Sequence, residues 1–378
     1  MIYLDNAATT LFKPSAVKNA VIAAMDSCGN PGRSGHKPAM KAAAVVYACR
    51  ETIAEFFGIA EPERVVFTQN ATHALNLAIK SQLKEGDHVV ISGYEHNSVV
   101  RPLEGLAEKG INYTAAYSAL FDQNEMFEKL AAAITESTSC MVVNHVSNVF
   151  GSIAPLKKID ELCAEKGLAL ILDLSQSAGV IPIDLSEFQS VTYACMPGHK
   201  SLYGPQGTGI LICCGEGPYR SLMEGGTGSN SLERRQPEFL PDVFESGTMN
   251  VAGIAGLNEG VRFLKKRTVE TVGRWEAHLV SEFTEKLRDL EGLVCYAPPV
   301  PESGVVSLKF NKIPSERAAE LLAEMGVCVR AGLHCAPLAH HSAGTLPDGT
   351  VRFSFCAFNT DLEVQRAAQC VKKLLTQG

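Results

Sequence analysis

The stretch Met196-Pro197-Gly198-His199-Lys200-Ser201-Leu202-Tyr203-Gly204-Pro205-Gln206-Gly207-Thr208-Gly209 lies between two apolar runs, residues 190–195 and 210–212. Both runs are typical of strands, so Lys200 is expected just past a strand end, before a glycine-rich turn. An ammonium group beside bulky apolar sequence is disfavoured unless it is paired or used chemically, because burial penalises its charge. The surroundings of Lys200 therefore carry the strongest chemical signal in the sequence.

Lys200 allows more than one interpretation. Considered alone, it is best explained as a surface lysine at a turn. A nucleotide-binding loop is not supported, because that pattern requires Gly-Lys-Ser/Thr after its glycines. A lysine with a lowered pKa can also form a Schiff base, which is the chemistry of pyridoxal phosphate enzymes. Lys200 is better explained as a Schiff-base lysine only if the chain also supplies partners for the rest of that cofactor.

Composition limits the class of protein. The chain has 378 residues, of which 46% are hydrophobic and 20% charged, so we expect a globular protein with one large core and a smaller domain. A net charge of −7 and the lack of a long basic run argue against nucleic-acid binding. No signal peptide is evident, and the apolar runs fall short of the roughly 20 residues that span a membrane. Twelve scattered cysteines suit a reducing cytoplasm.

Strands and helices alternate along the first half of the chain. We expect strands at residues 64–68, 88–92, 139–145 and 168–173, with helices at 72–80, up to 109, and 156–167. Residues 168–173 are apolar on both faces, as in a parallel sheet covered by helices. This alternation predicts a doubly wound, mostly parallel α/β domain.

The second half of the chain predicts a smaller α+β domain. Its expected elements are a long helix at 251–290, a half-exposed strand at 305–310, a helix at 315–325, a strand at 351–355 and a helix at 361–375. We place the large domain at residues 15–255 and the small domain at 256–378. Residues 1–14 are expected to pack on the small domain.

Polar residues follow the strand ends, where α/β sheets bind ligands. Thr72 begins a helix that could hold a phosphate, although it could equally be a helix cap. Asp173, with Gln176 three residues later, ends the most apolar strand, and a pyridinium nitrogen would pair its carboxylate. His96 and Asn148 follow two other strands. Each has an ordinary explanation as a loop or turn residue, but several strand ends offer the parts of one cofactor site.

Over nearly its whole length the chain resembles the cysteine desulfurase and selenocysteine lyase branch of the class V aminotransferase-fold enzymes. The segments that carry this resemblance are residues 3–10, 95–96, 145–148, 173–176, 198–205, 245–248, 330–336 and 351–354. The resemblance implies the fold type I of pyridoxal phosphate-dependent transferases.

The resemblance also implies which residues bind pyridoxal phosphate. Lys200 would form the Schiff base, and Asp173 and Gln176 would contact the ring nitrogen and the phenolic oxygen. His96 would stack on the ring, with Asn148 near the phenolic oxygen. The phosphate would be bound by residues Ala71, Thr72 and His199. Thr248 would reach the phosphate of a neighbouring subunit, which implies a homodimer with shared active sites.

Two C-terminal motifs sharpen the resemblance. Arg330-x-Gly332-x-x-Cys335 is similar to the segment that carries the desulfurase nucleophile. Arg352 stands where the family binds the substrate carboxylate, a task that suits a planar guanidinium. Without the motif, Cys335 would be one buried thiol among twelve. A metal site made by His334, Cys335, His340 and His341 fits no common zinc spacing, and we expect no metal.

The sequence departs from the family pattern in two places. Pro197 stands where the family often has a serine that helps to hold the phosphate, so one contact is expected to be lost or replaced. Residues 336–349, which follow Cys335, are turn-rich, and we expect this segment to be mobile.

The resemblance implies an enzyme that converts L-cysteine to L-alanine. Lys200 would move the α-proton, and the Cys335 thiolate would attack the substrate sulfur to give a persulfide. Arg330 would favour that thiolate, and His96 would shuttle a further proton. A sulfur-acceptor protein would then take the sulfur. The alternatives are a selenocysteine lyase, an aminotransferase, epimerase or other lyase of the same fold, and a scaffold that has lost its chemistry.

Overall fold

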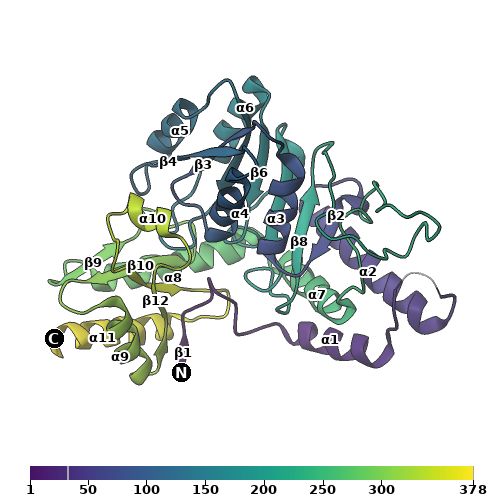
Figure 1. Ribbon diagram of the computed structural model, residues 1–378. Helices are drawn as coiled ribbons and strands as arrows, with labels where there is room; N and C mark the ends of the chain where they lie inside the picture. The colour runs from purple at the N-terminus through teal and green to yellow at the C-terminus, as the bar shows by residue number, and fades with distance from the viewer. Residues whose placement is uncertain (32–33, 378) are drawn as a thin grey trace.

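A seven-stranded sheet forms the middle of the larger part of the molecule (Figure 1). The computed structural model describes residues 1–31 and 34–377. In order across the sheet, the strands are β2 (Val65–Thr68), β8 (Gly209–Cys213), β7 (Val191–Pro197), β6 (Ala169–Asp173), β5 (Thr138–Asn144), β3 (His88–Ser92) and β4 (Asn112–Ala116). Every neighbouring pair is parallel except the two pairs that β8 makes. The predicted mostly parallel α/β sheet is therefore confirmed.

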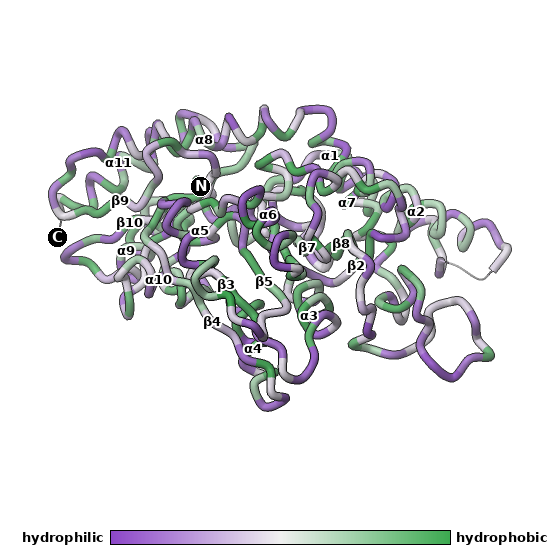
Figure 2. Tube along the Cα trace, turned by 90° about the horizontal axis from the view of Figure 1, so that it is seen from above, coloured by the Kyte–Doolittle hydropathy of each residue, from purple (hydrophilic) through white to green (hydrophobic). Residues whose placement is uncertain are grey.

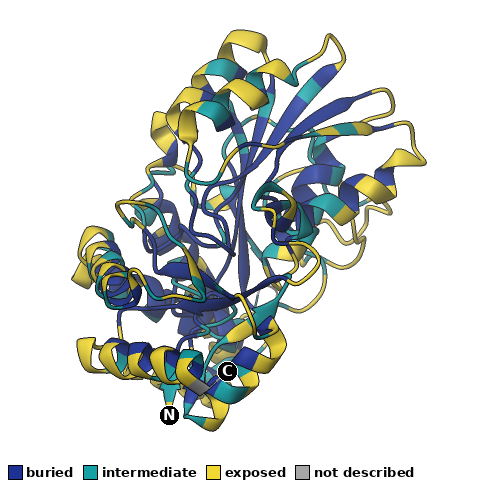
Figure 3. Cartoon of the chain, turned by 90° about the vertical axis from the view of Figure 1, so that its left-hand side faces the viewer, coloured by how far each residue is buried: buried dark blue, intermediate teal, exposed yellow. Residues whose placement is uncertain are grey.

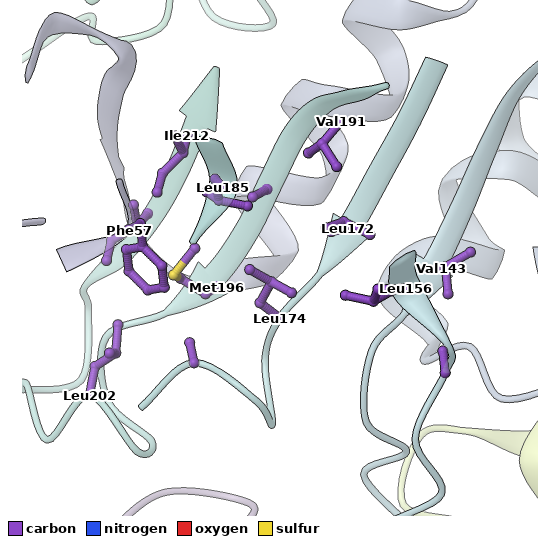
Figure 4. Close-up of a cluster of buried hydrophobic side chains, with 14 of the residues drawn as sticks. Phe57, Val143, Leu156, Leu172, Leu174, Leu185, Val191, Met196, Leu202 and Ile212 are labelled. Carbon is purple, nitrogen blue, oxygen red and sulfur yellow. The ribbon is translucent and has the colours of Figure 1, made fainter. Parts of the chain in front are cut away.

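Helices cover both faces of this sheet, which explains why its strands are apolar throughout. The helices are α2 (Lys37–Phe56), α5 (Gln123–Ala132), α6 (Leu156–Lys166) and α7 (Val251–Arg267) on one face, and α3 (Ala71–Gln82) and α4 (Asn97–Ala107) on the other. Along β6, Leu170 and Leu172 enter one core while Ile171 enters the other. Figure 4 shows Leu172 among its neighbours in the first core. Figures 2 and 3 show the apolar, buried strands between more polar, exposed helices.

A four-stranded antiparallel sheet forms a third core, separate from the two that flank the large sheet. Its strands, in order, are β12 (Arg330–Gly332), β13 (Thr350–Ser354), β10 (Val305–Phe310) and β9 (Leu293–Tyr296). The helices that pack on it are α8 (Val269–Leu287), α9 (Ser315–Glu324) and α11 (Asp361–Gln377). This core excludes the side chains of the seven-stranded sheet, so the two sheets are stabilised by separate hydrophobic clusters.

The N-terminal segment connects the two sheets. β1 (Ile2–Tyr3) pairs with β11 (Val327–Cys328), and Leu4 is fully buried in the core of the small sheet. Farther along, the Lys13 ammonium and the Thr10 hydroxyl both donate to the carbonyl oxygen of His199, at 2.8 and 3.1 Å. The segment thus reaches from the small sheet to the turn that carries Lys200.

The long helix expected at residues 251–290 is wrong: two helices, α7 and α8, meet at Thr268. The backbone of Thr268 has φ 67°, which breaks the helix, and its side chain accepts a hydrogen bond from the Thr271 amide at 3.3 Å. α7 packs on α1 (Ser15–Ser27) and α2, whereas α8 packs on α11. The domain boundary expected between residues 255 and 256 lies inside α7.

The strand expected at residues 305–310 is present as β10, but it is buried rather than half-exposed. β10 lies between β13 and β9, so neither edge is free. Its polar Ser307 has no exposed surface, and its hydroxyl is satisfied there by donating to the carbonyl oxygen of Val149 at 2.6 Å. Of the two polar residues in the strand, Ser307 makes this internal hydrogen bond, whereas Lys309 keeps partial contact with solvent and pairs with Asp348.

Among the described residues, no helix combines the length and the apolar character needed to cross a bilayer.

Candidate active site

Several of the predicted site residues lie at the carboxyl edge of the large sheet. Lys200 follows β7, Asp173 ends β6, and His96 stands between β3 and α4. Gly209, at the start of β8, lets the N-terminus of α3 approach closely, because a Cβ there would lie 2.6 Å from the Cα atom of Asn70. The turn that carries Lys200 and the first turn of α3 are therefore neighbours.

The charges around Lys200 and His96 indicate that both belong to one site. Burial lowers the pKa of Lys200 to about 8, and the nearby Asp173 carboxylate opposes this shift. Burial likewise lowers the pKa of His96 to about 4, so its imidazole is neutral at physiological pH. The charged side chains that act on both groups are Asp173, Arg330 and Arg352.

Asp173 and Gln176 are fixed by backbone partners. The Asp173 side chain is 1% exposed, and one carboxylate oxygen accepts from the Ser175 amide at 2.9 Å. The Gln176 amide donates to the carbonyl oxygen of Ala7 at 3.0 Å, so the N-terminal segment forms part of the wall. A carboxylate buried this deeply, which makes no ion pair among the described residues, suits a cationic partner such as a pyridinium nitrogen.

The first turn of α3 and His199 together offer donors for an anion. Asn70 caps the helix by accepting from the His73 amide at 2.9 Å, whereas the amides of Ala71 and Thr72 have no acceptor within the described part of the chain. Nδ1 of His199 is buried and also lacks a partner there. Free amides at a helix N-terminus favour phosphate. These residues, with Lys200 and Asp173, therefore fit pyridoxal phosphate.

Arg352 is the most deeply buried cation of the site, with 1% of its surface exposed. One guanidinium nitrogen donates to the carbonyl oxygen of Asn148 at 2.9 Å, and another pairs with the Asp5 carboxylate at 2.8 Å. Its Nε has no partner in the part of the chain that the structure covers. Burial lowers the pKa of Arg352, and Asp5 opposes the shift. The side-chain amide of Asn148 donates to the carbonyl oxygen of His334 at 2.9 Å.

Cys335 lies on an exposed loop that is attached to the start of α4. Its carbonyl oxygen accepts from the Asn97 amide at 2.7 Å, one residue after His96. A guanidinium nitrogen of Arg330 lies 3.9 Å from its sulfur. Burial raises the pKa of the Cys214 thiol to about 12, whereas the Cys335 thiol is exposed to solvent beside a cation. The environment of Cys335 thus suits a nucleophile.

The segment after Cys335 contains a short helix, α10 (Pro337–Ser342). The Ser342 hydroxyl donates to the carbonyl oxygen of Gly93 at 3.0 Å, which fixes the helix to the end of β3. His334 and His340 make hydrogen bonds with Thr350 and Thr345. In the described ranges, no cluster of three His, Cys, Asp or Glu side chains has an arrangement that could hold a metal ion.

Thr248 is not brought to the other predicted residues. It is exposed, in the long segment between β8 and α7, and lines a cavity of about 180 Å³ with Gln69 and His73. A different cleft of about 410 Å³ contains Thr72, His96 and Cys335. A larger cavity, about 750 Å³, is lined by residues 120–124, 151–153 and 297–302 and contains none of the predicted residues, so chemistry and not size identifies the site.

Sequence reasoning missed the role of Glu95, which has no exposed surface. Its Oε1 accepts from the Ser92 hydroxyl at 2.6 Å and from the Asn144 amide at 2.7 Å, so it connects the ends of β3 and β5. Burial raises the pKa of Glu95 to about 8, which keeps the acid protonated at neutral pH. An acidic residue next to the candidate His96, directly after an apolar strand, was the available signal.

Comparisons with known proteins support a relationship over the whole chain. The family model described as "Aminotransferase class-V" matches residues 2–367. A probable cysteine desulfurase of Halalkalibacterium halodurans is 32% identical over 99% of this chain and 93% of its own length. Another, from Methanothermobacter thermautotrophicus, is 29% identical over 100% of this chain and 95% of its own.

A solved structure gives the same result. The apo cysteine desulfurase of Thermococcus onnurineus NA1 superposes with a TM-score of 0.91 at 27% identity, covering 100% of this chain and 95% of that one.

Proposed function

Because this chain belongs to the aminotransferase class-V family, in its cysteine desulfurase branch, we propose that it converts L-cysteine to L-alanine and keeps the sulfur on Cys335 as a persulfide. One observation carries this proposal. The exposed Cys335 sulfur lies 3.9 Å from the Arg330 guanidinium, on a loop bonded to the residue after His96. A transaminase or epimerase needs no thiol there.

We propose pyridoxal phosphate as the cofactor. Lys200 would bind its aldehyde carbon, and the amides of Ala71 and Thr72, with His199, would hold its phosphate. Asp173 would face the ring nitrogen, Gln176 and Asn148 the phenolic oxygen, and His96 the ring. When bound, the cofactor supplies an electron sink for the negative charge left at the substrate α-carbon. The free amides and the unpartnered Nδ1 of His199 support this assignment.

The remaining steps belong to the side chains of the protein. Lys200 accepts the substrate α-proton, a task suited to an amine whose pKa is lowered to about 8. His96, neutral because burial lowers its pKa to about 4, can pass on a further proton. The Cys335 thiolate attacks the substrate sulfur, so the carbon–sulfur bond breaks as the sulfur–sulfur bond forms. The proton count balances, because a thiol and cysteine give a persulfide and alanine.

Substrate binding is assigned to Arg352, supported by Arg330. The two residues lie directly opposite each other in neighbouring strands, and Arg352 is buried whereas Arg330 is exposed. The unpartnered Nε of Arg352 leaves a donor free for the substrate carboxylate, although two other nitrogens are already paired. A guanidinium binds a carboxylate with directed, charge-assisted hydrogen bonds.

We also propose a cytoplasmic homodimer in which Thr248 reaches the phosphate site of the partner copy. The supporting observation is that Thr248 is exposed and lines a cavity whose lining does not include Lys200. A second copy of the chain would then complete each site.

The test measures alanine and sulfide from L-cysteine, with and without a thiol reductant. Without reductant we expect about one alanine per active site, followed by a stop while Cys335 holds the sulfur. With reductant, both products should accumulate together. Amino transfer that depends on a keto acid, or a colourless protein that does not bind pyridoxal phosphate, would contradict the proposal. The ratio of turnover on L-selenocysteine to that on L-cysteine separates a selenocysteine lyase from a desulfurase.

A further inference from the structure

A cleft of about 410 Å³ opens beside Cys335 and runs between α3 and α4. We call it the α3–α4 cleft. Its inner end is formed by Thr72, His96 and Cys335, which belong to the site described above. Its other charged lining residues are Lys80, Arg101 and Lys109, and none of them has a part in the proposed chemistry.

The helix periodicity arranges the lining residues in two rows. Thr72, Asn76 and Lys80 are spaced by four residues along α3, and Arg101, Gly105 and Lys109 are spaced by four along α4 and just beyond its end. Residues four apart lie on one face of a helix. A Cβ at Gly105 would meet no atom within 4 Å, so the α4 wall remains open at its middle. Figure 1 shows the two helices side by side at the surface.

The cleft is cationic in a chain that is acidic overall. Lys80, Arg101 and Lys109 contribute three positive charges, and no aspartate or glutamate lines the cleft, while the whole chain carries a net charge of −7. Within the described ranges, none of the three makes an ion pair or a side-chain hydrogen bond. By contrast, Arg64 pairs with Glu61 and Glu216. Unpaired charges of one sign in a cleft attract ligands of the opposite sign.

We infer that the α3–α4 cleft binds an acidic polypeptide segment of the sulfur acceptor, next to the thiol that receives the sulfur. This inference rests on the proposed desulfurase function. L-Cysteine does not explain the cations, because the amino acid carries no net charge at neutral pH and its carboxylate is assigned to Arg352. A macromolecule that carries glutamate or aspartate beside a thiol matches both the charge of the cleft and its position.

The transfer step needs no further reactant. The acceptor thiolate attacks the outer sulfur of the Cys335 persulfide, the sulfur–sulfur bond to Cys335 breaks, and Cys335 leaves as a thiolate. The acceptor becomes the persulfide, so atoms and electrons balance. Electrostatic attraction in the cleft raises the rate of encounter and weakens as salt is added.

The experiment uses two synthetic thiol peptides as probes, each a hexapeptide with one cysteine, one carrying four glutamates and the other four lysines. The enzyme is first loaded with one sulfur by a single turnover on L-cysteine. The second-order rate of sulfur transfer to each peptide is then followed by mass analysis. At low salt we expect the acidic peptide to react about 10-fold faster or more, with the preference disappearing at high salt.

Charge reversal at the cleft should abolish this preference. The variant Lys80→Glu, Arg101→Glu, Lys109→Glu is compared with Lys129→Glu, Lys312→Glu, Lys372→Glu, which makes the same change in net charge at exposed positions elsewhere. Both variants should load Cys335 as the wild type does. Only the cleft variant should lose the preference for the acidic peptide. The single variant Arg101→Glu should show a smaller loss, and it serves if the triple variant does not fold.

Three results would overturn the inference. The first is equal rates for both peptides with the loaded wild type, which leaves the desulfurase function intact. The second is an equal loss of preference in the control variant. The third is a change of oligomeric state: if the wild type and the control variant are dimers but the cleft variant is a monomer, a second copy of the chain covers the cleft. A wild-type enzyme that never loads Cys335 would refute the proposed function and this inference with it.

Discussion

The two halves of the site differ in their exposure to solvent. At the sheet edge, burial lowers the pKa of Lys200 to about 8 and that of His96 to about 4, and Asp173 is 1% exposed. Cys335 on its loop and Arg330 in the adjoining strand β12 are both exposed. Proton transfer benefits from an enclosed environment that adjusts pKa values, whereas sulfur must leave the protein. We conclude that the enclosed half performs the carbon chemistry and the open half the sulfur chemistry.

The two arginines illustrate the same division within one ladder. Arg330 of β12 lies directly opposite Arg352 of β13 in the strand register. Arg352 is buried and paired with Asp5, whereas Arg330 is exposed and approaches the Cys335 sulfur. Identical side chains thus serve different halves, and their neighbours decide which.

The largest effect is expected in the enclosed half, at Lys200. Lys200→Ala should lower kcat about 10³-fold or more, because both the cofactor attachment and the proton acceptor are lost. Lys13→Ala is the matched control. Burial also lowers the pKa of Lys13 to about 8, but its ammonium is bonded to the carbonyl oxygen of His199. Borohydride reduction of the wild type should attach the cofactor mass to the Lys200 peptide. Attachment to the Lys13 peptide instead would show that Lys13, and not Lys200, binds the cofactor.

Asp173→Asn should come next, with a loss of about 10²- to 10³-fold in kcat. An amide cannot stabilise a protonated ring nitrogen, but its oxygen can still accept from the Ser175 amide, so the fold should persist. The measurement is turnover together with the amount of bound cofactor. Near-normal turnover with full cofactor content would show that the Asp173 carboxylate is not needed for the carbon chemistry.

Arg352→Ala tests the boundary between the halves. We expect KM for L-cysteine to rise by the equivalent of about 1.5–3 kcal/mol, because a charge-assisted contact is lost. Arg352→Lys should recover only part, since an ammonium cannot reproduce the two-pronged guanidinium contact. Asp5→Asn controls for the broken ion pair. If KM does not change in the Ala variant, carboxylate binding belongs to Arg330 and the open half.

The smallest effect is expected for Glu95→Gln, which imitates the protonated acid. Burial raises the pKa of Glu95 from 4.5 to about 8, so its protonated form stabilises the fold below about pH 4.5 and this contribution is lost as pH rises through about 8. Relative to the Gln variant, the wild-type melting temperature should therefore fall as pH increases from about 6 to 9. Glu95→Ala should cost about 1–3 kcal/mol, because the Asn144 amide loses its acceptor. If the difference in melting temperature between the wild type and the Gln variant does not change with pH, the pKa of Glu95 is not raised in the folded protein.

The sequence predicted elements where one physical signal was sufficient. β6 was predicted because the run at residues 168–173 is apolar on both faces, and the structure buries four of the five strand residues. The break at Thr268 was missed, although Lys265, Lys266 and Arg267 end α7 and a threonine cap with Glu270 begins α8. Those are ordinary signals of a helix end and a helix start.

The candidate site was predicted at the level of strand ends, but its internal contacts were not. The pair of Asp5 and Arg352 joins residues 347 positions apart, a distance that no local pattern reports. The burial of Ser307 depends on Val149, in another domain core. Such contacts are set by how the two sheets meet, and this follows from the tertiary fold rather than from spacing.

The carbon chemistry and the sulfur chemistry separate at one atom, the sulfur of Cys335. The decisive measurement is a single turnover of L-cysteine, followed by mass analysis of every cysteine-containing peptide. We predict one added sulfur on Cys335, none on Cys213, Cys214 or Cys328, and none anywhere in Cys335→Ala. That variant should still bind the cofactor and change its visible spectrum when L-cysteine is added. A persulfide on another cysteine, or wild-type sulfur release by Cys335→Ala, would contradict the account.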